Sequence, residues 1–373
     1  MIFRERQSEF KGLTVKMIIV DTGRPRHHGE GSGSRSPGLV GAILLFFYRA
    51  VRRGRIALLA SCFGIGALGC GGNEGSDVSV NETSDELTRL EIVGSNAFWY
   101  YADLDAATNF YTETLGLKIA ADYGFAKILH VAGTSYLTLV DGTMGMHTPD
   151  EPKTVALALV TDQLDEWWEY LTHQGVEMRN TYNPTEDSAH DGFVAYDPEG
   201  YYLEFERFNP HPENEQFLPI LERAETVLAQ SVGSKVPSGL GFKATVLWLY
   251  YRDLPGMEDF WEDEIGLRMV ADQGWAKIYK TSSTGFIGLV DETRGMHSYT
   301  EQKAVTVSLW TNQLAEWFEQ VRGGALEMRS ESIEEENPRY RAFVGYDPEG
   351  YYIEFDTFLP HEDNEELLLL INR

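Results

Sequence analysis

The chain has 373 residues, 43% of them hydrophobic, so it is long enough for two domains that each bury a core. Its formal net charge is −27 and is unevenly spread: residues 1–69 hold 11 Lys and Arg against 4 Asp and Glu, whereas the remainder holds 20 against 54. A body this acidic repels nucleic acids and anionic lipid head groups, which excludes both as its partners; the charge either attracts a cationic ligand or forms a solvated surface.

Residues 1–50 receive no fold assignment, and we expect the natural translation start to lie near residue 50. Residues 51–69 are similar to a signal peptide, because Arg52, Arg53 and Arg55 precede an apolar run of about 14 residues. A bilayer-spanning helix needs roughly 20 apolar residues, so a cleaved signal is favoured over a membrane anchor. Residues 67–70 resemble a bacterial lipobox, which implies that Cys70 becomes the acylated first residue of the mature protein.

The expected location is therefore the bacterial cell envelope, where a lipid on Cys70 is the protein's membrane attachment. An ordinary secretory signal, giving a secreted or periplasmic protein, and an uncleaved anchor are the alternatives. Cys62 and Cys70 are the only cysteines, so the rest of the chain can form no disulfide, thiolate metal site or cysteine nucleophile. Residues 70–92 have the polar composition of a flexible linker.

A long internal repeat organises the remaining sequence. Residues 100–215 align with residues 250–365 at a constant offset of 150 without a gap; for example, YDPEGYYLEF at 196–205 matches YDPEGYYIEF at 346–355. A period this long indicates a duplicated domain rather than a solenoid. We expect domains at 93–212 and 241–361, separated by a helix and linker at 213–240 and followed by a C-terminal helix at 362–373.

Each copy is predicted to contain two similar halves. In copy one, a strand at 96–102 leads to a helix capped by Asp103, and strands follow near 117–122, 125–131 and 135–141. The second half starts with a strand at 154–160 and a helix that we expect Asp162 to cap, followed by strands near 176–180, 192–197 and 201–207. Copy two repeats this order, with Asp253 and Asn312 at the cap positions. The pattern predicts an α+β fold class, with helices packed on one face of a sheet.

Three motifs together resemble the vicinal oxygen chelate superfamily, which includes glyoxalase I, bleomycin-resistance proteins and extradiol dioxygenases. They are DLDAATNFYTETLGL at 103–117, TDQLDEWWEYLTHQGV at 161–176 and DPEGYYLEF at 197–205. The resemblance covers roughly residues 95–210 and 245–360. It implies two tandem domains of paired βαβββ modules, with the sheet curled into a cup around a ligand and the helices on the outer face.

The resemblance also implies where a divalent metal would bind in such a cup. The carboxylate on the last strand of a copy corresponds to Glu204 or Glu354. The first-strand ligands would stand at Asn96, Val155, Val246 and Val305. Valine cannot bind a metal and asparagine binds transition metals poorly, so we expect no metal cofactor. The alternative is a divalent metal held by Glu204, Glu354, His147 and His297.

The side chains that share the predicted cup follow from the two-residue period of a strand. In copy one they are Asn96, Phe98, Tyr100, Val155, Leu157, Leu159, Tyr202, Glu204 and Glu206; in copy two they are Val246, Trp248, Tyr250, Val305, Val307, Leu309, Tyr352 and Glu354. These aromatic and aliphatic walls suit an apolar or cationic organic ligand. An acid inside them should have a raised pKa and could act as a general base, unless a tyrosine simply holds it inert.

Two further pairs of residues are candidates for the site. Lys127 and Lys277 lie in mid-strand, where they either point to solvent or, if they point inwards, pair with the cup glutamate or bind an anionic substrate. His147 and His297 lie in the loops between modules and either pack there or act as ligands.

The sequence thus favours a small-molecule-binding protein that lacks a functional metal site and is exported as a lipoprotein. The alternatives are a glyoxalase-like lyase or extradiol-dioxygenase-like oxidoreductase that uses Glu204 and Glu354, and a partner-binding scaffold. The ligand and the oligomeric state do not follow from the sequence.

Overall fold

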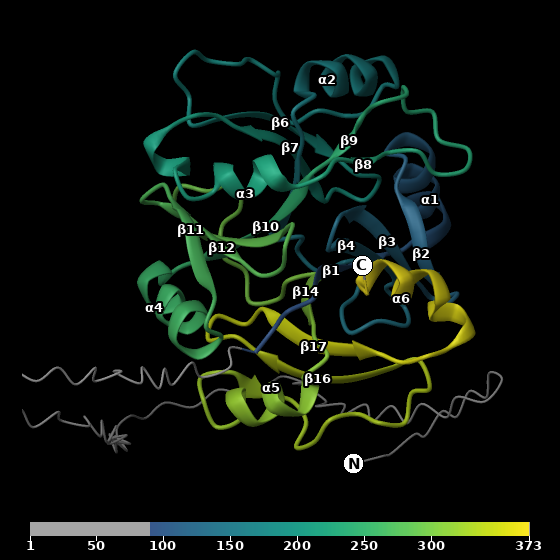
Figure 1. Cartoon of the computed structure of the whole chain (residues 1–373), viewed down its shortest axis with the longest axis vertical. Coiled ribbons are helices and arrows are strands. Elements are labelled where there is room, and N and C mark those ends of the chain that lie inside the picture. Colours follow the sequence, from purple (N-terminus) through teal and green to yellow (C-terminus); the bar gives the residue numbers. More distant parts are fainter. Residues whose placement is uncertain (1–89, 373) are drawn as a thin grey trace, which may run out of the picture. The chain divides into compact units, whose positions relative to one another are not determined.

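The computed structural model describes residues 90–372, so the predicted signal peptide, Cys70 and most of the predicted linker lie outside the described residues. The described part is built on two mixed sheets, one of eight strands and one of seven, with short helices beside them (Figure 1). This confirms the α+β class and the tandem duplication. No helix in residues 90–372 has the length and apolar character needed to cross a membrane.

Copy one forms its elements close to the expected places. They are β1 (Gly94–Tyr101), α1 (Leu104–Asn109) with a π-helical turn (Phe110–Thr114), β2 (Lys118–Asp122), β3 (Ala126–Ala132), β4 (Ser135–Asp141), β5 (Val155–Val160), α2 (Leu164–His173), β6 (His190–Tyr196), β7 (Tyr202–Phe208), a 3-10 turn (Pro212–Asn214) and α3 (Leu218–Arg223). Asp103 caps α1 as predicted, because its Oδ1 accepts the backbone N–H of Ala106 at 2.9 Å.

Copy two repeats this order after a short hairpin. Its elements are β8 (Val227–Leu228), β9 (Gly241–Phe242), β10 (Ala244–Tyr251), α4 (Leu254–Asp259) with a π-helical turn (Phe260–Glu264), β11 (Arg268–Asp272), β12 (Ala276–Lys280), β13 (Gly285–Asp291), β14 (Val305–Trp310), α5 (Leu314–Val321), β15 (Glu327–Met328), β16 (Tyr340–Tyr346), β17 (Tyr352–Phe358), a 3-10 turn (Glu362–Asn364) and α6 (Glu365–Ile371). The strand expected at 176–180 is reduced to a single bridge between Met178 and Ala195.

The two modules that share a sheet come from different copies. The eight-stranded sheet has the order β15-β16-β17-β14-β1-β4-β3-β2, and the seven-stranded sheet has the order β11-β12-β13-β10-β5-β7-β6. In the first sheet Asn96 of β1 lies opposite Ser308 of β14, and in the second Val246 of β10 lies opposite Ala158 of β5. Paired modules are therefore present as expected, but each sheet combines the first module of one copy with the second module of the other.

The duplicated DPEGYY motif holds the copies together. Tyr201 is fully buried; its hydroxyl accepts the backbone N–H of Tyr100 at 2.9 Å and donates to the carbonyl of Ala304 in copy two at 2.6 Å. Tyr351 reciprocates with the backbone N–H of Tyr250 and the carbonyl of Thr154 in copy one, both at 2.8 Å. Because a buried hydroxyl without partners would be costly, these bonds fix the arrangement of both sheets.

The main core lies on the helix-covered faces of both sheets, and it corrects one sequence prediction. Val155, Leu157, Leu159, Val305, Val307 and Leu309, expected in the cups, belong to this core. The opposite face of β5 carries Ala156, Ala158 and Val160 instead. The sequence prediction places both helix caps one residue too early. The N-cap residues of α2 and α5 are Gln163 and Gln313, not Asp162 and Asn312. A one-residue slip in a strand moves every side chain to the other face.

Candidate functional site

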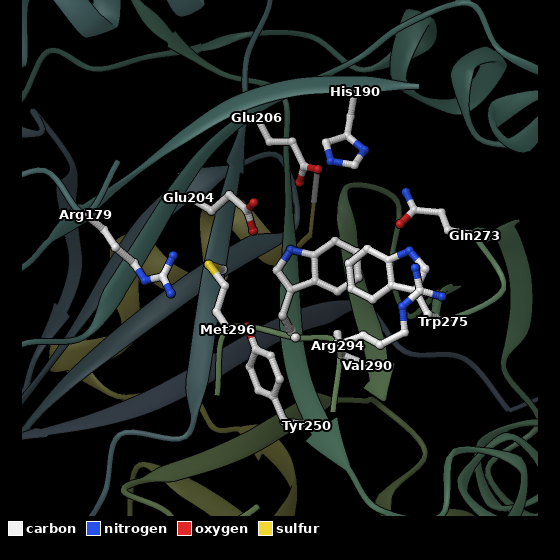
Figure 2. A pocket seen from close by; sticks show the side chains of 12 residues that line it. Arg179, His190, Glu204, Glu206, Tyr250, Gln273, Trp275, Val290, Arg294 and Met296 are labelled. Atoms are coloured by element: carbon white, nitrogen blue, oxygen red, sulfur yellow. The ribbon is translucent and has the colours of Figure 1, made fainter. Parts of the chain in front are cut away.

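Each sheet has a second face, opposite the main core, which we call its cup: cup I on the eight-stranded sheet and cup II on the seven-stranded sheet. Cup II contains a pocket of about 300 Å³ (Figure 2). Its lining residues come from both edges of the sheet, since His190 lies in β6 and Gln273 next to β11, so the sheet curls around the pocket. The complete lining is Arg179, His190, Glu204, Glu206, Trp248, Tyr250, Gln273, Trp275, Val290, Arg294, Gly295 and Met296.

Two glutamates from β7 reach the pocket on the same face of that strand. Burial raises the pKa of Glu204 to about 7. The charge of Arg179 and the indole N–H of Trp248 lower this pKa. Because Trp248 Nε1 makes no well-formed hydrogen bond, its effect is a weak electrostatic one. The pKa of Glu206 is raised well above its usual range by burial and then by the charge of Glu204. At neutral pH Glu204 can therefore hold or release a proton, while the surroundings of Glu206 favour its uncharged form.

Unpaired polar atoms gather at this pocket. Buried atoms without a hydrogen-bond partner include His190 Nδ1, Glu206 Oε2, Gln273 Nε2 and Trp248 Nε1. Burial also lowers the pKa of His190, so its ring is neutral near pH 7. Each such atom costs about 1–3 kcal/mol when it stays unsatisfied, and a bound polar molecule would remove that cost.

His147 and His297 each lie beside a cup. Neither histidine lies on the side of the glutamate from its own copy. His297 stacks on Tyr202 of cup II at 4.2 Å between ring centroids, and burial lowers its pKa to about 4. His147 lies beside Tyr100 of cup I and its Nδ1 is 2.7 Å from Glu151 Oε2. Because the copies exchange modules, His297 is the histidine on the Glu204 side and His147 is the one on the Glu354 side.

Cup I has the same strands but a closed polar network. Ser308 Oγ donates to Asp356 Oδ2 at 2.7 Å and accepts the Trp310 indole N–H at 2.8 Å. Asn96 accepts from Thr138 at 3.1 Å, and the Tyr100 hydroxyl lies 2.6 Å from Thr306 Oγ1. Trp310 and Tyr136 pack with ring centroids 4.2 Å apart. These side chains satisfy one another, so the interior of cup I offers few free groups to a ligand.

In the described residues, neither cup brings together the set of metal ligands that the sequence resemblance implies. At the first-strand and last-strand positions, cup II offers Val246, Ala156 and Glu204, which is a single carboxylate. Cup I offers Asn96, Thr306 and Glu354, but the first two are already hydrogen-bonded. Within residues 90–372 no three His, Cys, Asp or Glu side chains come together as a metal-binding group. The donors therefore do not fit a transition metal, which needs several converging ligands.

The structure divides the other predicted site residues between three places. Tyr202, Glu204, Glu206, Val246, Trp248 and Tyr250 lie in cup II. Asn96, Phe98, Tyr100, Tyr352 and Glu354 lie in cup I, on the face defined by the pairing of Asn96 with Ser308 and of Ser308 with Glu354. Val155, Leu157 and Val305 lie on the helix-covered face.

Lys127 and Lys277 also lie away from the cups. Lys127 pairs across the sheet with Leu139, which belongs to the main core, and its Nζ is 2.7 Å from Asp122. Lys277 Nζ is 2.7 Å from Asp272 and 3.8 Å from Glu258 of α4. Both lysines therefore belong to ion pairs on the outer face.

Several pocket residues have no counterpart in the sequence prediction: Arg179, His190, Gln273, Trp275 and Arg294. All except His190 lie outside regular strands, where the two-residue period gives no direction for a side chain. The sequence does contain one signal, because Trp275 belongs to the duplicated GxAKI motif and is a large aromatic residue in a turn. His190 is the first residue of β6, but the sequence pattern predicts that strand only from about residue 192.

Comparisons with known proteins agree with this fold. Residues 97–205 match the model of the Glyoxalase/Bleomycin resistance protein/Dioxygenase superfamily. A putative dioxygenase from Bacillus subtilis is 13% identical, with a TM-score of 0.54, over 75% of this chain and 91% of its own. Glyoxalase I from Zea mays is 16% identical, with a TM-score of 0.51, over 76% and 95%. No curated protein sequence matches. Residues 97–205 are therefore similar to this superfamily, and the described part of the chain has the vicinal oxygen chelate fold.

Proposed function

We propose that the protein binds a small organic molecule in cup II without the help of a metal ion. The observation that carries this proposal is the pocket itself: about 300 Å³ of space, aromatic walls, and four buried polar atoms that lack partners. Binding pockets typically combine an apolar lining with a few polar groups that orient the ligand. Cup I supports no equal proposal, because its polar groups bond to one another.

The alternative of a metal-dependent lyase or oxidoreductase finds less support. It requires converging donor atoms around Glu204 or Glu354, and the neighbouring strand positions are Ala156 and Val246 in one cup and hydrogen-bonded Asn96 in the other. Elemental analysis of the purified protein tests this point. We expect less than one transition metal ion per ten chains; a stoichiometric metal that is lost in Glu204→Ala or Glu354→Ala would overturn the metal-free proposal.

The binding proposal is tested by a thermal-shift screen of small organic molecules against the purified protein. Trp275 lines cup II, and Phe125 is its counterpart at the offset of 150 in cup I. Molecules that stabilise the protein should lose their effect in Trp275→Ala and retain it in the matched control Phe125→Ala. A screen without stabilising molecules, or hits that depend equally on both residues, would contradict the proposal.

We further propose that the mature protein is exported and attached to a membrane through a lipid on Cys70. The support is the sequence alone, with basic residues, an apolar run and a lipobox-like end before Cys70. Expressed in a bacterium with a labelled fatty acid, the full chain should incorporate label and Cys70→Ala should not. Equal labelling of both proteins, or of neither, would show that the assignment is wrong.

A further inference from the structure

Two arginines at the rim of cup II have no acidic partner. Arg179 and Arg294 both line the pocket, and neither takes part in an ion pair among the residues that the structure describes. Each guanidinium instead lies over an aromatic ring: Arg179 is 5.4 Å from the centre of Tyr202, and Arg294 is 5.3 Å from that of Trp275. Asp291 is close enough to sense the charge of Arg294 but uses its carboxylate to accept from Thr293.

The pocket interior does not neutralise these two charges. Glu206 is only 1% exposed, and its burial, together with the nearby charge of Glu204, favours the uncharged carboxyl. Glu204 is only partly ionised at pH 7, and His190 is neutral. Cup II therefore carries two guanidinium charges without a salt-bridge partner among the described residues, in a body with 20 basic against 54 acidic residues after residue 69.

The donors and the aromatic rings have a definite arrangement. Figure 2 shows Gln273, Trp275 and Arg294 on one side of the pocket and Arg179 on the other. Gln273 Nε2 is a buried N–H donor without a partner, and Arg294 adds charged N–H donors on the same side. A guanidinium beside an amide donor suits a carboxylate, which accepts hydrogen bonds at two oxygens. The indole rings of Trp248 and Trp275 offer flat surfaces to the rest of the ligand.

The matching positions of cup I lack these features. At the offset of 150, Met144 replaces Arg294, Tyr123 replaces Gln273 and Phe125 replaces Trp275. Arg329 is the counterpart of Arg179, and its guanidinium is already bonded, because it donates to the Tyr352 hydroxyl at 2.6 Å. The positive rim is thus a property of cup II and not of the duplicated scaffold.

From these observations we infer that the ligand of cup II is a planar organic anion, such as an aromatic carboxylate, whose anionic group lies at Arg294 and Gln273 and whose ring lies against the tryptophans. This inference rests on the proposed function and departs from the cationic ligand that the acidic composition suggested. The neutral Glu206 carboxyl can donate a hydrogen bond to an oxygen of such a ligand from the pocket interior.

Three matched probes test the inference by isothermal titration with the full-length protein: 1-naphthoate, neutral 1-naphthamide and cationic 1-naphthylmethylammonium. We expect naphthoate to bind most tightly and the cation most weakly. Arg294→Met, which copies Met144 of cup I, should weaken naphthoate about fivefold to tenfold at low salt and leave naphthamide within twofold. The control Arg322→Met, at the C-cap of α5, should change neither. The preference for naphthoate should shrink as salt is added.

The outcomes separate this inference from the proposed function. If naphthamide or the ammonium probe binds as tightly as naphthoate and its binding requires Trp275, the pocket binds organic ligands but the inference of an anion is wrong. If Arg294→Met weakens all three probes equally, Arg294 shapes the pocket rather than recognises charge, and the inference fails again. If no probe binds while screening hits depend on Trp275, the planar-anion class is wrong and the proposed function stands.

Discussion

Apart from β15, cup I and cup II are built from equivalent strands in the same order, yet the polar side chains inside cup I bond to one another whereas cup II contains an open pocket. In cup I, Ser308, Trp310 and Asp356 bond to one another in the interior, whereas the positions of cup II at the offset of 150 are Ala158, Val160 and Glu206. Smaller apolar residues stand in place of Ser308 and Trp310, and Glu206 is left without a partner for Oε2. A duplicated scaffold has thus specialised one cup by exchanging a few side chains.

The rims of the two cups also differ in the side chains that they present. Around cup I, large apolar side chains are exposed: Phe125 at 39%, Met144 at 59% and Met146 at 45%. Their counterparts around cup II are Trp275, Arg294 and Met296, which line the pocket. The rim position that carries Arg294 in cup II thus carries the exposed Met144 in cup I.

The largest effect should come from separating the two copies, because each cup needs both. A chain that ends at residue 230 keeps one module of each sheet, so both sheets lose their partner strands β10 and β14. We expect no cooperatively folded monomer, as measured by urea denaturation and sedimentation velocity. A folded monomer of copy one alone would show that the exchange of modules is dispensable.

In the matched control both copies are present, but the peptide chain between them is cleaved. Val232 is fully exposed, so a protease site between it and Gly233 should be accessible. After cleavage the two pieces should remain one complex with almost unchanged thermal stability, since the strand pairs across the copies are intact.

Next in size is the close contact between Gly288 and Trp248 in cup II. A Cβ at position 288 would lie 1.9 Å from Trp248 Cε3, so Gly288→Ala should cost about 1–3 kcal/mol of unfolding free energy and displace the indole from the pocket. Cup I has Thr138 and the smaller Phe98 at these positions. Gly288→Ala combined with Trp248→Phe should therefore recover much of the stability, and a double-mutant cycle without coupling would contradict this explanation.

The two buried acids of cup I should have a smaller effect on stability, and that effect should depend on pH. Burial raises the pKa of Glu354 above its usual range, and it raises that of Asp356 to about 6. A raised pKa in the folded state means that the stability contributed by the protonated acid is present at low pH and is lost as the pH rises through about 4 to 6 and beyond. Glu354→Gln, which cannot ionise, should therefore be more stable relative to the parent at pH 8 than at pH 4, as measured by urea denaturation at the two pH values.

The same substitution in cup II sharpens the comparison. Burial also raises the pKa of Glu204, to about 7, but no neighbouring acid in the described part of the chain adds to this shift, whereas the charge of Asp356 raises the pKa of Glu354 further. Glu204→Gln should consequently change the pH dependence of unfolding less than Glu354→Gln does. Equal effects in urea denaturation at pH 4 and pH 8 would show that the two acids have equivalent surroundings.

The smallest effect is expected at the two outer-face lysines. Lys127 and Lys277 pair with the half-exposed Asp122 and Asp272, so each pair contributes little. Lys127→Ala and Lys277→Ala should each change the unfolding free energy by less than about 1 kcal/mol and leave ligand binding in cup II unaltered. A loss of ligand binding in Lys277→Ala would place that lysine at the site after all.

The sequence by itself determined the duplication at an offset of 150, the module order, the caps at Asp103 and Asp253, and the cup-facing positions of Glu204, Trp248 and Glu354. These features are local, because they follow from turn residues and from a two-residue period in strands that alternate in character.

Only the tertiary structure decided which modules share a sheet and which face of β5 and β14 lies in a cup. Val155–Val160 is apolar throughout and buried on both faces, so its sequence gives no alternation from which a face can be read. Val305–Trp310 does alternate, with Thr306 and Ser308 between apolar residues, but because both of its faces are buried the polar residues do not mark a solvent-facing side. The exchange between copies is equally hidden, because both copies offer the same strand edges and the choice depends on contacts such as those of Tyr201 and Tyr351. The positive rim of cup II also depends on loops, whose directions no periodic pattern predicts.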